Sequence, residues 1–316
     1  MDATGAVTRA VTEFAAHHPD LGREVCVGLS GGPDSLALLA CALRADLHVH
    51  ALVVDHGLQP GSDAVASAAA DAALALGAEA TVLPVRVGSD GGMEAAARTA
   101  RYAALDDARD GRPVLLAHTA DDQAETVLLG LARGSGARSI AGMRAWNPPW
   151  GRPLLDVRRA QTLAACAELG LRPHHDPHNR DPRFTRVRVR SEVLPLLDDV
   201  LHGGVVEALG RTADSLQADN DALDALADDL RTRAAVGDDL DAEVLAVAPA
   251  AVRTRALRCW LLDVGATEPT HRVIGAVDAM VTDRRSRAQV AIGGDPAART
   301  VVVRSDSRLR VERTPR

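Results

Sequence analysis

Short apolar runs alternate with longer alanine-rich stretches through the first half of the chain. The short runs are rich in valine and leucine and predict buried β-strands, whereas the alanine-rich stretches space their apolar residues at helical intervals. The predicted strands are Val25–Leu29, His48–Val54, Ala80–Val87 and Pro113–Ala117, and the predicted helices are Ser35–Arg44, Ser62–Leu76, Met93–Arg109 and Asp122–Ala132. Such alternation predicts an α/β fold, a parallel sheet with helices on both faces.

The pattern changes near residue 200. Residues Val205–Ala234 predict a long, acidic, Ala/Leu-rich helix, and mixed elements follow, among them Val301–Val303 and Leu309–Val311. Because 316 residues exceed what one core usually organises, we expect two domains. We expect them to be residues 1–200 and a smaller, largely helical C-terminal domain with a basic tail, residues 201–316.

Composition narrows the class of protein. The sequence shows no signal peptide and no apolar run of membrane-spanning length, so we expect a cytoplasmic protein with no membrane part. Four scattered cysteines without a Cys-x-x-Cys pair argue against zinc, an iron–sulfur cluster and a disulfide framework. All 36 basic residues are arginine, so any phosphate contact must come from arginine, a backbone N–H or a metal.

The formal net charge of −7 is unevenly spread. Residues 198–243 hold 13 acidic residues and 3 arginines, which is typical of a solvated helix face. By contrast, arginines crowd residues 180–190, and the tail after Val281 has nine arginines against four acidic residues. These two basic zones are candidates for binding a polyanion.

The turn after the first predicted strand carries the strongest chemical signal. It reads Ser30, Gly31, Gly32, Pro33, Asp34, Ser35. The two glycines allow positive φ, so successive N–H groups can converge on an anion at the start of the next helix, where proline is well tolerated. The turn lacks the endings of a Walker A loop and of a dinucleotide fingerprint. An ordinary glycine-rich turn is the alternative.

A second polar cluster follows the fourth predicted strand. His118 ends that strand, Asp121 is placed to cap the next helix, and Asp122 and Glu125 share a face of its first turn. Such carboxylates can hold Mg²⁺ on a polyphosphate or receive an ammonium group, and the histidine can assist proton transfer. A capping box with solvated acids is the alternative. Because ligands sit beyond the carboxyl ends of parallel strands, we expect this cluster, the glycine turn and Asp55–Gly57 to converge.

The glycine turn resembles the pyrophosphate loop, Ser-Gly-Gly-x-Asp-Ser, of the N-type ATP pyrophosphatases (PP-loop superfamily). Over about residues 22–200 the chain is similar to the tRNA(Ile)-lysidine synthase family, which shows the same motifs in the same order. Beside the loop they are Val54–Gln59, Met93–Tyr102, His118–Thr126, Arg133–Gly136, Ala141–Met143, Arg152–Leu155 and Asp176–Asn179. Gln59 departs from the arginine of many members.

The resemblance implies an adenine nucleotide alpha hydrolase-like fold and a ligase reaction. ATP adenylates the C2 carbonyl oxygen of the wobble cytidine in tRNA(Ile) with a CAU anticodon, and free lysine displaces AMP to give lysidine. ATP would be bound by Ser30, Gly31, Gly32, Pro33, Asp34, Ser35, Asp55 and His56.

The resemblance also implies the remaining site roles. Asp34 would hold Mg²⁺, and Ser35 could donate to phosphate. Arg101, on the Met93–Arg109 helix, would neutralise charge on the phosphates, and Arg98 is a further candidate. Catalysis would involve Asp34, Arg101, His118, Asp122 and Glu125, and the lysine substrate would contact Asp122, Glu125 and Glu94.

The basic zone before residue 200 is the candidate tRNA surface. Its arginines alternate with apolar residues, and the candidates are Arg183, Arg186, Arg188 and Arg190. The alternative is a half-buried strand or helix with an arginine-rich wet side. Aromatic residues are few, so recognition should depend on RNA shape and phosphates.

Two other functions stay open. A tRNA 2-thiolase would share the loop and the adenylation step, but should carry cysteines near its site. A non-catalytic ATP-binding sensor or an RNA-binding protein would not require the cluster of His118, Asp122 and Glu125.

Overall fold

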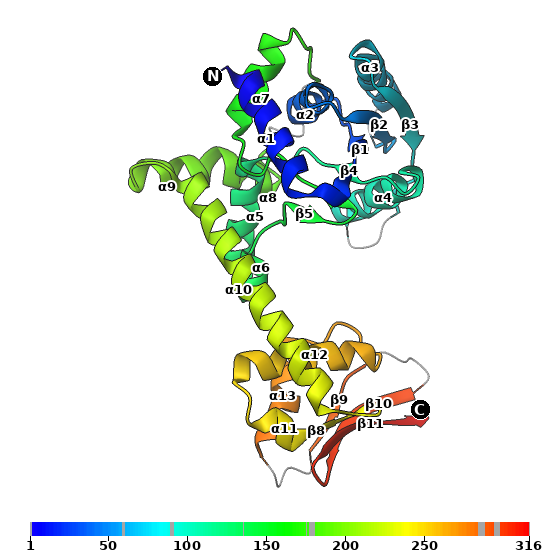
Figure 1. The fold of residues 1–316 in the computed structure, drawn as a ribbon, viewed down its shortest axis with the longest axis vertical. Coiled ribbons are helices and arrows are strands. Elements are labelled where there is room, and N and C mark those ends of the chain that lie inside the picture. Colours follow the sequence, from blue (N-terminus) through cyan, green and yellow to red (C-terminus); the bar gives the residue numbers. More distant parts are fainter. Residues whose placement is uncertain are drawn as a thin grey trace. The chain divides into compact units, whose positions relative to one another are not determined.

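The computed structural model describes residues 2–58, 61–88, 92–134, 136–174, 176, 181–283, 288–293 and 298–315, excluding the side chains of Met93, Glu94 and Ala298. The chain forms two compact units, Met1–Leu216 and Gln217–Arg316, and the boundary lies within helix α10, Val205–Ala234 (Figure 1). Each unit has its own hydrophobic core.

The N-terminal unit is built on a six-stranded sheet in the order β3-β2-β1-β4-β6-β5. Its strands are β1 Glu24–Gly28, β2 His48–Asp55, β3 Glu79–Pro84, β4 Val114–Leu115, β5 Trp146–Asn147 and β6 Trp150–Gly151. All neighbours pair in parallel except β5, which runs antiparallel to β6. The predicted parallel α/β fold is confirmed, and the short β5–β6 pair is an addition to it.

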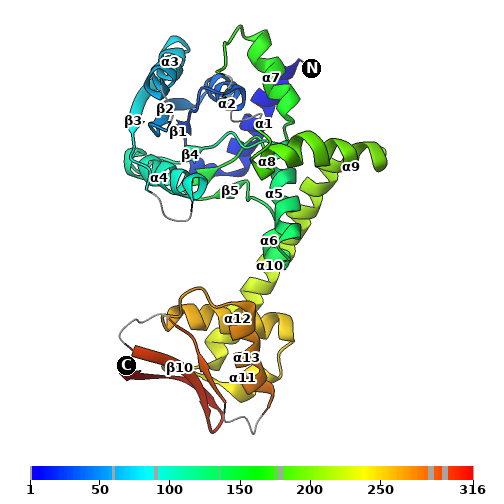
Figure 2. The same cartoon turned by 180° about the vertical axis from the view of Figure 1, so that it is seen from behind.

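Helices cover both faces of this sheet, and α2 and α4 lie on opposite sides of it (Figures 1 and 2). The helices of the sheet are α1 Ala3–His17, α2 Pro33–Arg44, α3 Ser62–Ala75, α4 Met93–Ala108, α5 Ala120–Ala132, α6 Ala137–Ile140 and α7 Arg159–Glu168. Buried residues of α1, α2, α3 and α7 share one core, whereas Leu105 of α4 packs with Cys26 and Leu52 on the opposite face.

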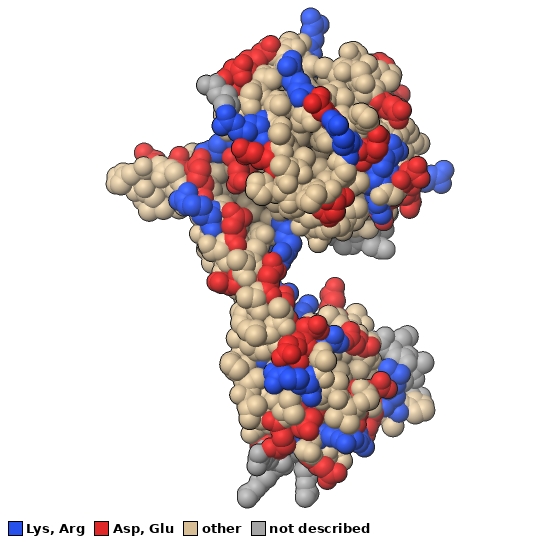
Figure 3. Space-filling model, in the orientation of Figure 1, with Lys and Arg blue, Asp and Glu red and all other residues tan. Residues whose placement is uncertain are grey.

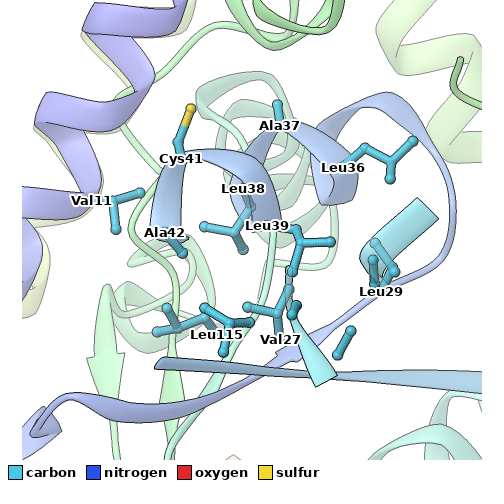
Figure 4. Close-up of a cluster of buried hydrophobic side chains, with 14 of the residues drawn as sticks. Val11, Val27, Leu29, Leu36, Ala37, Leu38, Leu39, Cys41, Ala42 and Leu115 are labelled. Carbon is cyan, nitrogen blue, oxygen red and sulfur yellow. The ribbon is translucent and has the colours of Figure 1, made fainter. Parts of the chain in front are cut away.

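Helix α2 is the centre of the larger core. Its residues Leu36 to Ala42 are almost completely buried, and Leu38 and Leu39 lie over Val27 and Leu115 of the sheet (Figure 4). A helix with apolar residues nearly all round is expected to be enclosed on several sides. This burial fixes the start of α2 relative to the end of β1, and so positions the turn between them.

A third core forms at the side of the sheet. Residues 185–200 are helical as α8 Thr185–Arg188, a π-helical turn Val189–Val193 and α9 Leu194–Val200. Val189 and Leu194 pack with Ala120 and Ala124 of α5 and with the first turn of α10. This packing places the arginine-rich segment against the start of α5.

The C-terminal unit combines helices with a separate antiparallel sheet in the order β7-β8-β11-β10-β9. Its elements after α10 are β7 Ala235–Val236, β8 Asp239–Asp241, α11 Ala242–Ala246, α12 Ala250–Asp263, α13 His271–Thr282, β9 Gln289–Ala291, β10 Ala298–Ser305 and β11 Arg308–Pro315. Leu257, Val277 and Val302 are wholly buried between helices and sheet. In the described part of the chain, no helix is long and apolar enough to span a membrane.

Charge is mixed on the face of the molecule drawn in Figure 3, where arginine and acidic side chains alternate over both units. Local ion pairs account for part of this mixing. Arg233 pairs with Asp229 one turn away on α10, and Arg231 pairs with Asp228. The acidic helix predicted from the sequence is thus partly neutralised by its own arginines.

Candidate active site

The turn between β1 and α2 has the geometry of an anion-binding loop. Gly31 adopts φ +75°, and a Cβ there would lie 3.2 Å from the Cβ of Ala69, so both backbone conformation and space favour glycine. Gly32 is the N-cap without a side-chain cap, and Pro33 occupies the first helical position. The first N–H groups of a buried helix are therefore left to a ligand.

Two serines brace this loop from within. The Ser35 hydroxyl donates to the Gly32 carbonyl at 3.0 Å and lies 3.1 Å from the Ser30 hydroxyl, and the Ser30 N–H donates back to Ser35 Oγ at 3.2 Å. Ser35 is buried. Its proton is used inside the loop, so the structure gives Ser35 a bracing position and not the phosphate-donating one expected from the sequence.

A pocket of about 670 Å³ opens beside the loop at the carboxyl ends of β1 and β2. Five of the site residues predicted from the sequence line this pocket, namely Ser30, Gly32, Asp55, His56 and Arg101. Leu52, Val54 and Leu105 add an apolar wall. The volume is in the range of a small-molecule site, 300–1,000 Å³ being typical.

Arg101 is the cation of this pocket. Its side chain is partly buried, and burial lowers its pKa from the ordinary arginine value. Within the described residues it makes no hydrogen bond or ion pair, whereas Arg98 on the same helix donates to the Tyr102 hydroxyl at 3.2 Å. A partly desolvated cation without a partner favours an anionic ligand.

Asp55 and His56 lie at the end of β2. The Gly57 N–H donates to Asp55 at 3.0 Å, and this bond, with a second from Ser62, holds the pKa of Asp55 below its ordinary value. Asp55 therefore braces a turn and also lines the pocket. Burial and the nearby Arg101 lower the pKa of His56, so His56 is neutral at pH 7.

Asp34 joins the loop to the second polar cluster. Arg159, at the start of α7, contacts Asp34 Oδ2 at 3.0 Å and Asp122 Oδ1 at 3.1 Å through the same nitrogen, Nη2. The Thr162 hydroxyl donates to the other oxygen of Asp34. The glycine loop and the start of α5 are therefore one site, as the strand-end argument predicts.

Burial and cations act in opposite directions on these acids. Burial raises the pKa of Asp34 above its ordinary value despite Arg159 and Thr162. Burial alone would also raise the pKa of Asp122, but Arg159, the Thr119 N–H and Arg190 outweigh it and hold that pKa below its ordinary value. The neighbouring cations thus under-compensate the negative charge of Asp34, whereas they fully stabilise the negative charge of Asp122.

Glu125 completes the network one turn along α5. Arg190 Nε lies 2.6 Å from Glu125 Oε1, and its Nη2 lies 3.1 Å from Asp122. Glu125 is wholly buried, and burial raises its pKa despite the hydrogen bond from Arg190. Its second oxygen, Oε2, has no hydrogen-bond partner among the described residues, with Arg186 3.7 Å away. A buried, unsatisfied carboxylate oxygen is a ready acceptor for an ammonium group.

The cap of α5 differs from the expectation. Thr119 is the N-cap and forms a capping box with Asp122, whose Oδ2 accepts from the Thr119 N–H at 2.9 Å. Asp121 instead accepts from the Arg159 N–H at 2.7 Å and pairs with Arg158. The prediction of Asp121 as cap is wrong because the helix begins two residues earlier, at Ala120. Asp122 therefore takes part in the capping box and also pairs with Arg159 and Arg190.

His118 is half-buried next to Asp122, with its Nδ1 enclosed. Burial lowers its pKa to about 3, more than the neighbouring Asp122 raises it, so the imidazole is neutral at pH 7. Its Nδ1 has no hydrogen-bond partner in the described structure. A base this weak is poorly matched to taking a proton near pH 7, so the proton-transfer role expected from the sequence is disfavoured.

His118 gives a testable pH dependence of stability. Its pKa falls from 6.5 to about 3 on folding, so the unfolded chain binds more protons and stability is lost as pH falls below 6.5. Between pH 7 and pH 5 this amounts to about 2 kcal/mol. Urea unfolding of His118→Gln should show a pH 7 to pH 5 loss smaller than the wild-type loss by that amount. Equal losses in both proteins would contradict a neutral His118.

The predicted RNA-contacting arginines separate into two groups. Arg190 and Arg186 turn toward Glu125, so Arg190 lies inside the acidic network and not on a free surface. Arg183 and Arg188 are exposed and pair with Asp181 and Glu192 of their own segment. The Glu94 side chain lies outside the described residues, as do most of the Asp176–Asn179 motif and Gln59.

Sequence reasoning missed the contribution of α7. Arg159 and Thr162 both contact Asp34, yet no helix was expected between residues 133 and 175. The signal available was Arg158 and Arg159 before an alanine-rich stretch, which is weak by itself. Arg152 was noted only as part of a motif, and it is buried with Nη1 donating to the Arg144 carbonyl at 3.0 Å.

Comparisons with known proteins decide the family. The PP-loop domain family matches residues 4–197, and the TilS substrate binding domain matches residues 240–310. The tRNA(Ile)-lysidine synthase of Nocardia farcinica is 63% identical over 96% of this chain and 96% of its own. The chain belongs to the tRNA(Ile)-lysidine synthase family. The family member of Mycobacterium tuberculosis strain H37Rv is 56% identical over the full length of both chains.

Among solved structures, the U34-tRNA thiolase NcsA from Methanococcus maripaludis has a similar fold. Its TM-score is 0.53 at 18% identity, covering 68% of this chain and 79% of that one. At this identity the likeness concerns the fold alone.

Proposed function

We propose that this lysidine synthase family member adenylates the wobble cytidine of tRNA(Ile) with a CAU anticodon and then joins free lysine to it, giving lysidine, AMP and pyrophosphate. The observation that carries the proposal is Arg159, which links Asp34 of the glycine loop to Asp122 of the acidic cluster. The N–H groups that would bind phosphate and the carboxylates that would bind an ammonium group therefore belong to one site.

ATP binding follows from the pocket. The N–H groups at the start of α2 and Arg101, which has no partner among the described residues, would face the phosphates, and Asp55 and His56 lie where the nucleoside would bind. Preorganised cations and N–H groups stabilise the charge that develops when the bond between the α and β phosphates breaks.

Asp34 is the residue that would hold Mg²⁺. The residues present fit the ion, because the Asp34 carboxylate is under-compensated by Arg159 and stands beside the phosphate loop. Mg²⁺ is usually bound by one or two carboxylates together with substrate phosphates. When bound, it would neutralise charge on the pyrophosphate leaving group. In the described part of the chain no cluster of three or more ligating side chains offers a protein-only metal site.

Glu125 and Asp122 are the proposed acceptors for lysine. Glu125 has a buried oxygen, Oε2, that accepts no hydrogen bond from the described residues, and Asp122 remains ionised because Arg159 and Arg190 stabilise its negative charge. A substrate ammonium bound here would lie next to the loop that binds ATP. His118, being neutral, would support this wall of the site and not act as the proton acceptor.

Binding of tRNA is proposed for the exposed arginines of residues 181–193 and for the matched substrate binding domain, residues 240–310. Arg188→Ala should weaken tRNA binding and reduce the slope of log Kd against log salt by about one unit per lost phosphate contact. Arg233→Ala is the matched control, since Arg233 and Arg188 each pair with an acid four residues away and are about equally exposed. Equal slopes for both variants would move the RNA surface away from Arg188.

The two other functions receive less support from the site. No cysteine lies among the described residues that line the pocket, and Cys26, Cys41 and Cys166 are buried, which disfavours a thiolase. A sensor has no need for the network of Asp34, Asp122 and Glu125.

Pyrophosphate release with each substrate omitted in turn tests the proposal. We expect release to require both ATP and tRNA, and sustained turnover to require lysine. Release unaffected by lysine would favour a thiolase, and no release under any condition would favour a sensor.

A further inference from the structure

Helix α7 and the segment after it hold the glycine loop from one side. The His174 N–H donates to the Gly31 carbonyl at 2.9 Å, and the Cys166 thiol donates to the Pro33 carbonyl at 3.2 Å. Arg159 forms an ion pair with one carboxylate oxygen of Asp34, and Thr162 donates a hydrogen bond to the other. Hydrogen-bond acceptors of the loop are thus satisfied by this segment, and the loop N–H groups at the start of α2 are left for the pocket.

Thr162 occupies a special place in this arrangement. It is wholly buried, and its Oγ1 lies 2.5 Å from Asp34 Oδ1 and 2.8 Å from the carbonyl of Arg159. A hydroxyl has one proton to donate, and a hydrogen bond to a carboxylate is stronger than one to a neutral carbonyl. The Thr162 hydroxyl therefore donates to Asp34. The Arg159 carbonyl is a second acceptor within reach.

This pair of acceptors allows Asp34 to be held and released. While Asp34 is bonded to Thr162 and Arg159, its carboxylate has a defined orientation, with each oxygen bonded to a residue of α7. When Asp34 turns to another partner, the Thr162 hydroxyl can rotate and donate to the Arg159 carbonyl, so no buried donor is left unpaired. A valine at this position would keep the shape but provide no donor, whereas a serine would provide the same single hydroxyl donor.

We propose that Thr162 is a positioning residue for adenylation, which orients the Asp34 carboxylate without touching a substrate. The inference rests on the proposed function, because it assigns Asp34 to the ATP site. Its physical content is that the Thr162 hydroxyl, and not the volume of the side chain, is required for the rate.

The test compares Thr162→Val with Thr162→Ser in steady-state pyrophosphate release with ATP, tRNA and lysine. We expect Thr162→Val to lower kcat about tenfold, the loss of one charge-assisted hydrogen bond, with KM for ATP within about twofold of wild type. Thr162→Ser should keep kcat within about twofold. The control is Thr212→Val, which loses a bond to its own helix carbonyl at an exposed site and should leave kcat unchanged.

Each contrary outcome has a distinct meaning. A Thr162→Val kcat equal to wild type overturns the inference. So does a loss shared equally by Thr162→Ser, or one matched by a lower folded fraction in thermal melting, because the side chain is then structural. A wild-type protein that releases no pyrophosphate contradicts the proposed function itself, and is recognised before any variant is made.

Discussion

Asp34→Asn should lower the rate of pyrophosphate release about 10³-fold while leaving the protein folded. The substitution keeps the size of the side chain but removes the charge that Arg159 contacts at 3.0 Å and that would hold Mg²⁺ beside the loop. Loss of a preorganised charge at a reacting phosphate typically costs 10²–10³-fold, about 3–4 kcal/mol. Steady-state kinetics with ATP, tRNA and lysine measures the loss, and circular dichroism checks the fold.

The control for this variant is Asp63→Asn. Asp63 also stands in the first turn of a helix that follows a strand of the sheet, but it is exposed. Its removal should change the rate by less than about twofold, since an exposed acid near a helix start contributes only about 0.3–1 kcal/mol, and that to stability. A rate for Asp34→Asn near that of Asp63→Asn would sink the role of Asp34.

Arg101→Gln should be the second most damaging change, with kcat/KM for ATP about 10²-fold lower. Arg101 lines the pocket and has no partner among the described residues, so its charge is available to the phosphates. A glutamine keeps hydrogen-bonding capacity but cannot stabilise the growing negative charge. Stability should not fall, because burial of an unpaired cation is unfavourable and its removal relieves that cost.

Arg109→Gln provides the comparison. Arg109 follows the last turn of the same helix, α4, and pairs with Asp106 away from the pocket. We expect its kinetics to match wild type within about twofold. If Arg101→Gln behaves in the same way, or if it destabilises the protein, the arginine has a structural role and the phosphates are bound elsewhere.

Much of the N-terminal unit could be predicted because its signals are local. Apolar strands, alanine-rich helices and the Gly31–Gly32 turn each depend on neighbouring residues, and the rule that parallel strands end at one edge brings their turns together. The convergence of Asp34 and Asp122 followed from that rule. The small differences in strand ends, such as β3 ending at Pro84, reflect the usual uncertainty of element boundaries.

The parts that could not be predicted depend on contacts between distant segments. Arg159 and Arg190 join acids that lie 37 or more residues away in the chain, and no local pattern specifies such pairing. From the sequence, Arg190 belongs to a run of arginines expected at the surface. The packing of Val189 and Leu194 on α5 instead directs the Arg190 side chain toward Glu125. The sheet of the C-terminal unit was partly visible in Val301–Val303 and Leu309–Val311, but the pairing of β11 with β8 joins residues about 70 positions apart.

The neutral state of His118 could not be predicted from the sequence either. A histidine beside two carboxylates is expected to gain a proton more easily, since nearby negative charge raises its pKa. Burial has the larger effect here and lowers the pKa to about 3. Only the three-dimensional surroundings decide which of the two effects is larger.

The central claim is that one site passes AMP from ATP to an RNA base and then exchanges it for lysine. The most direct measurement is mass spectrometry of nucleosides from tRNA(Ile) with a CAU anticodon, after incubation with ATP and isotopically labelled lysine. The account predicts label on the wobble cytidine alone, one AMP and one pyrophosphate for each lysine joined, and no label with Asp34→Asn. Pyrophosphate released without any lysine entering the RNA would contradict it.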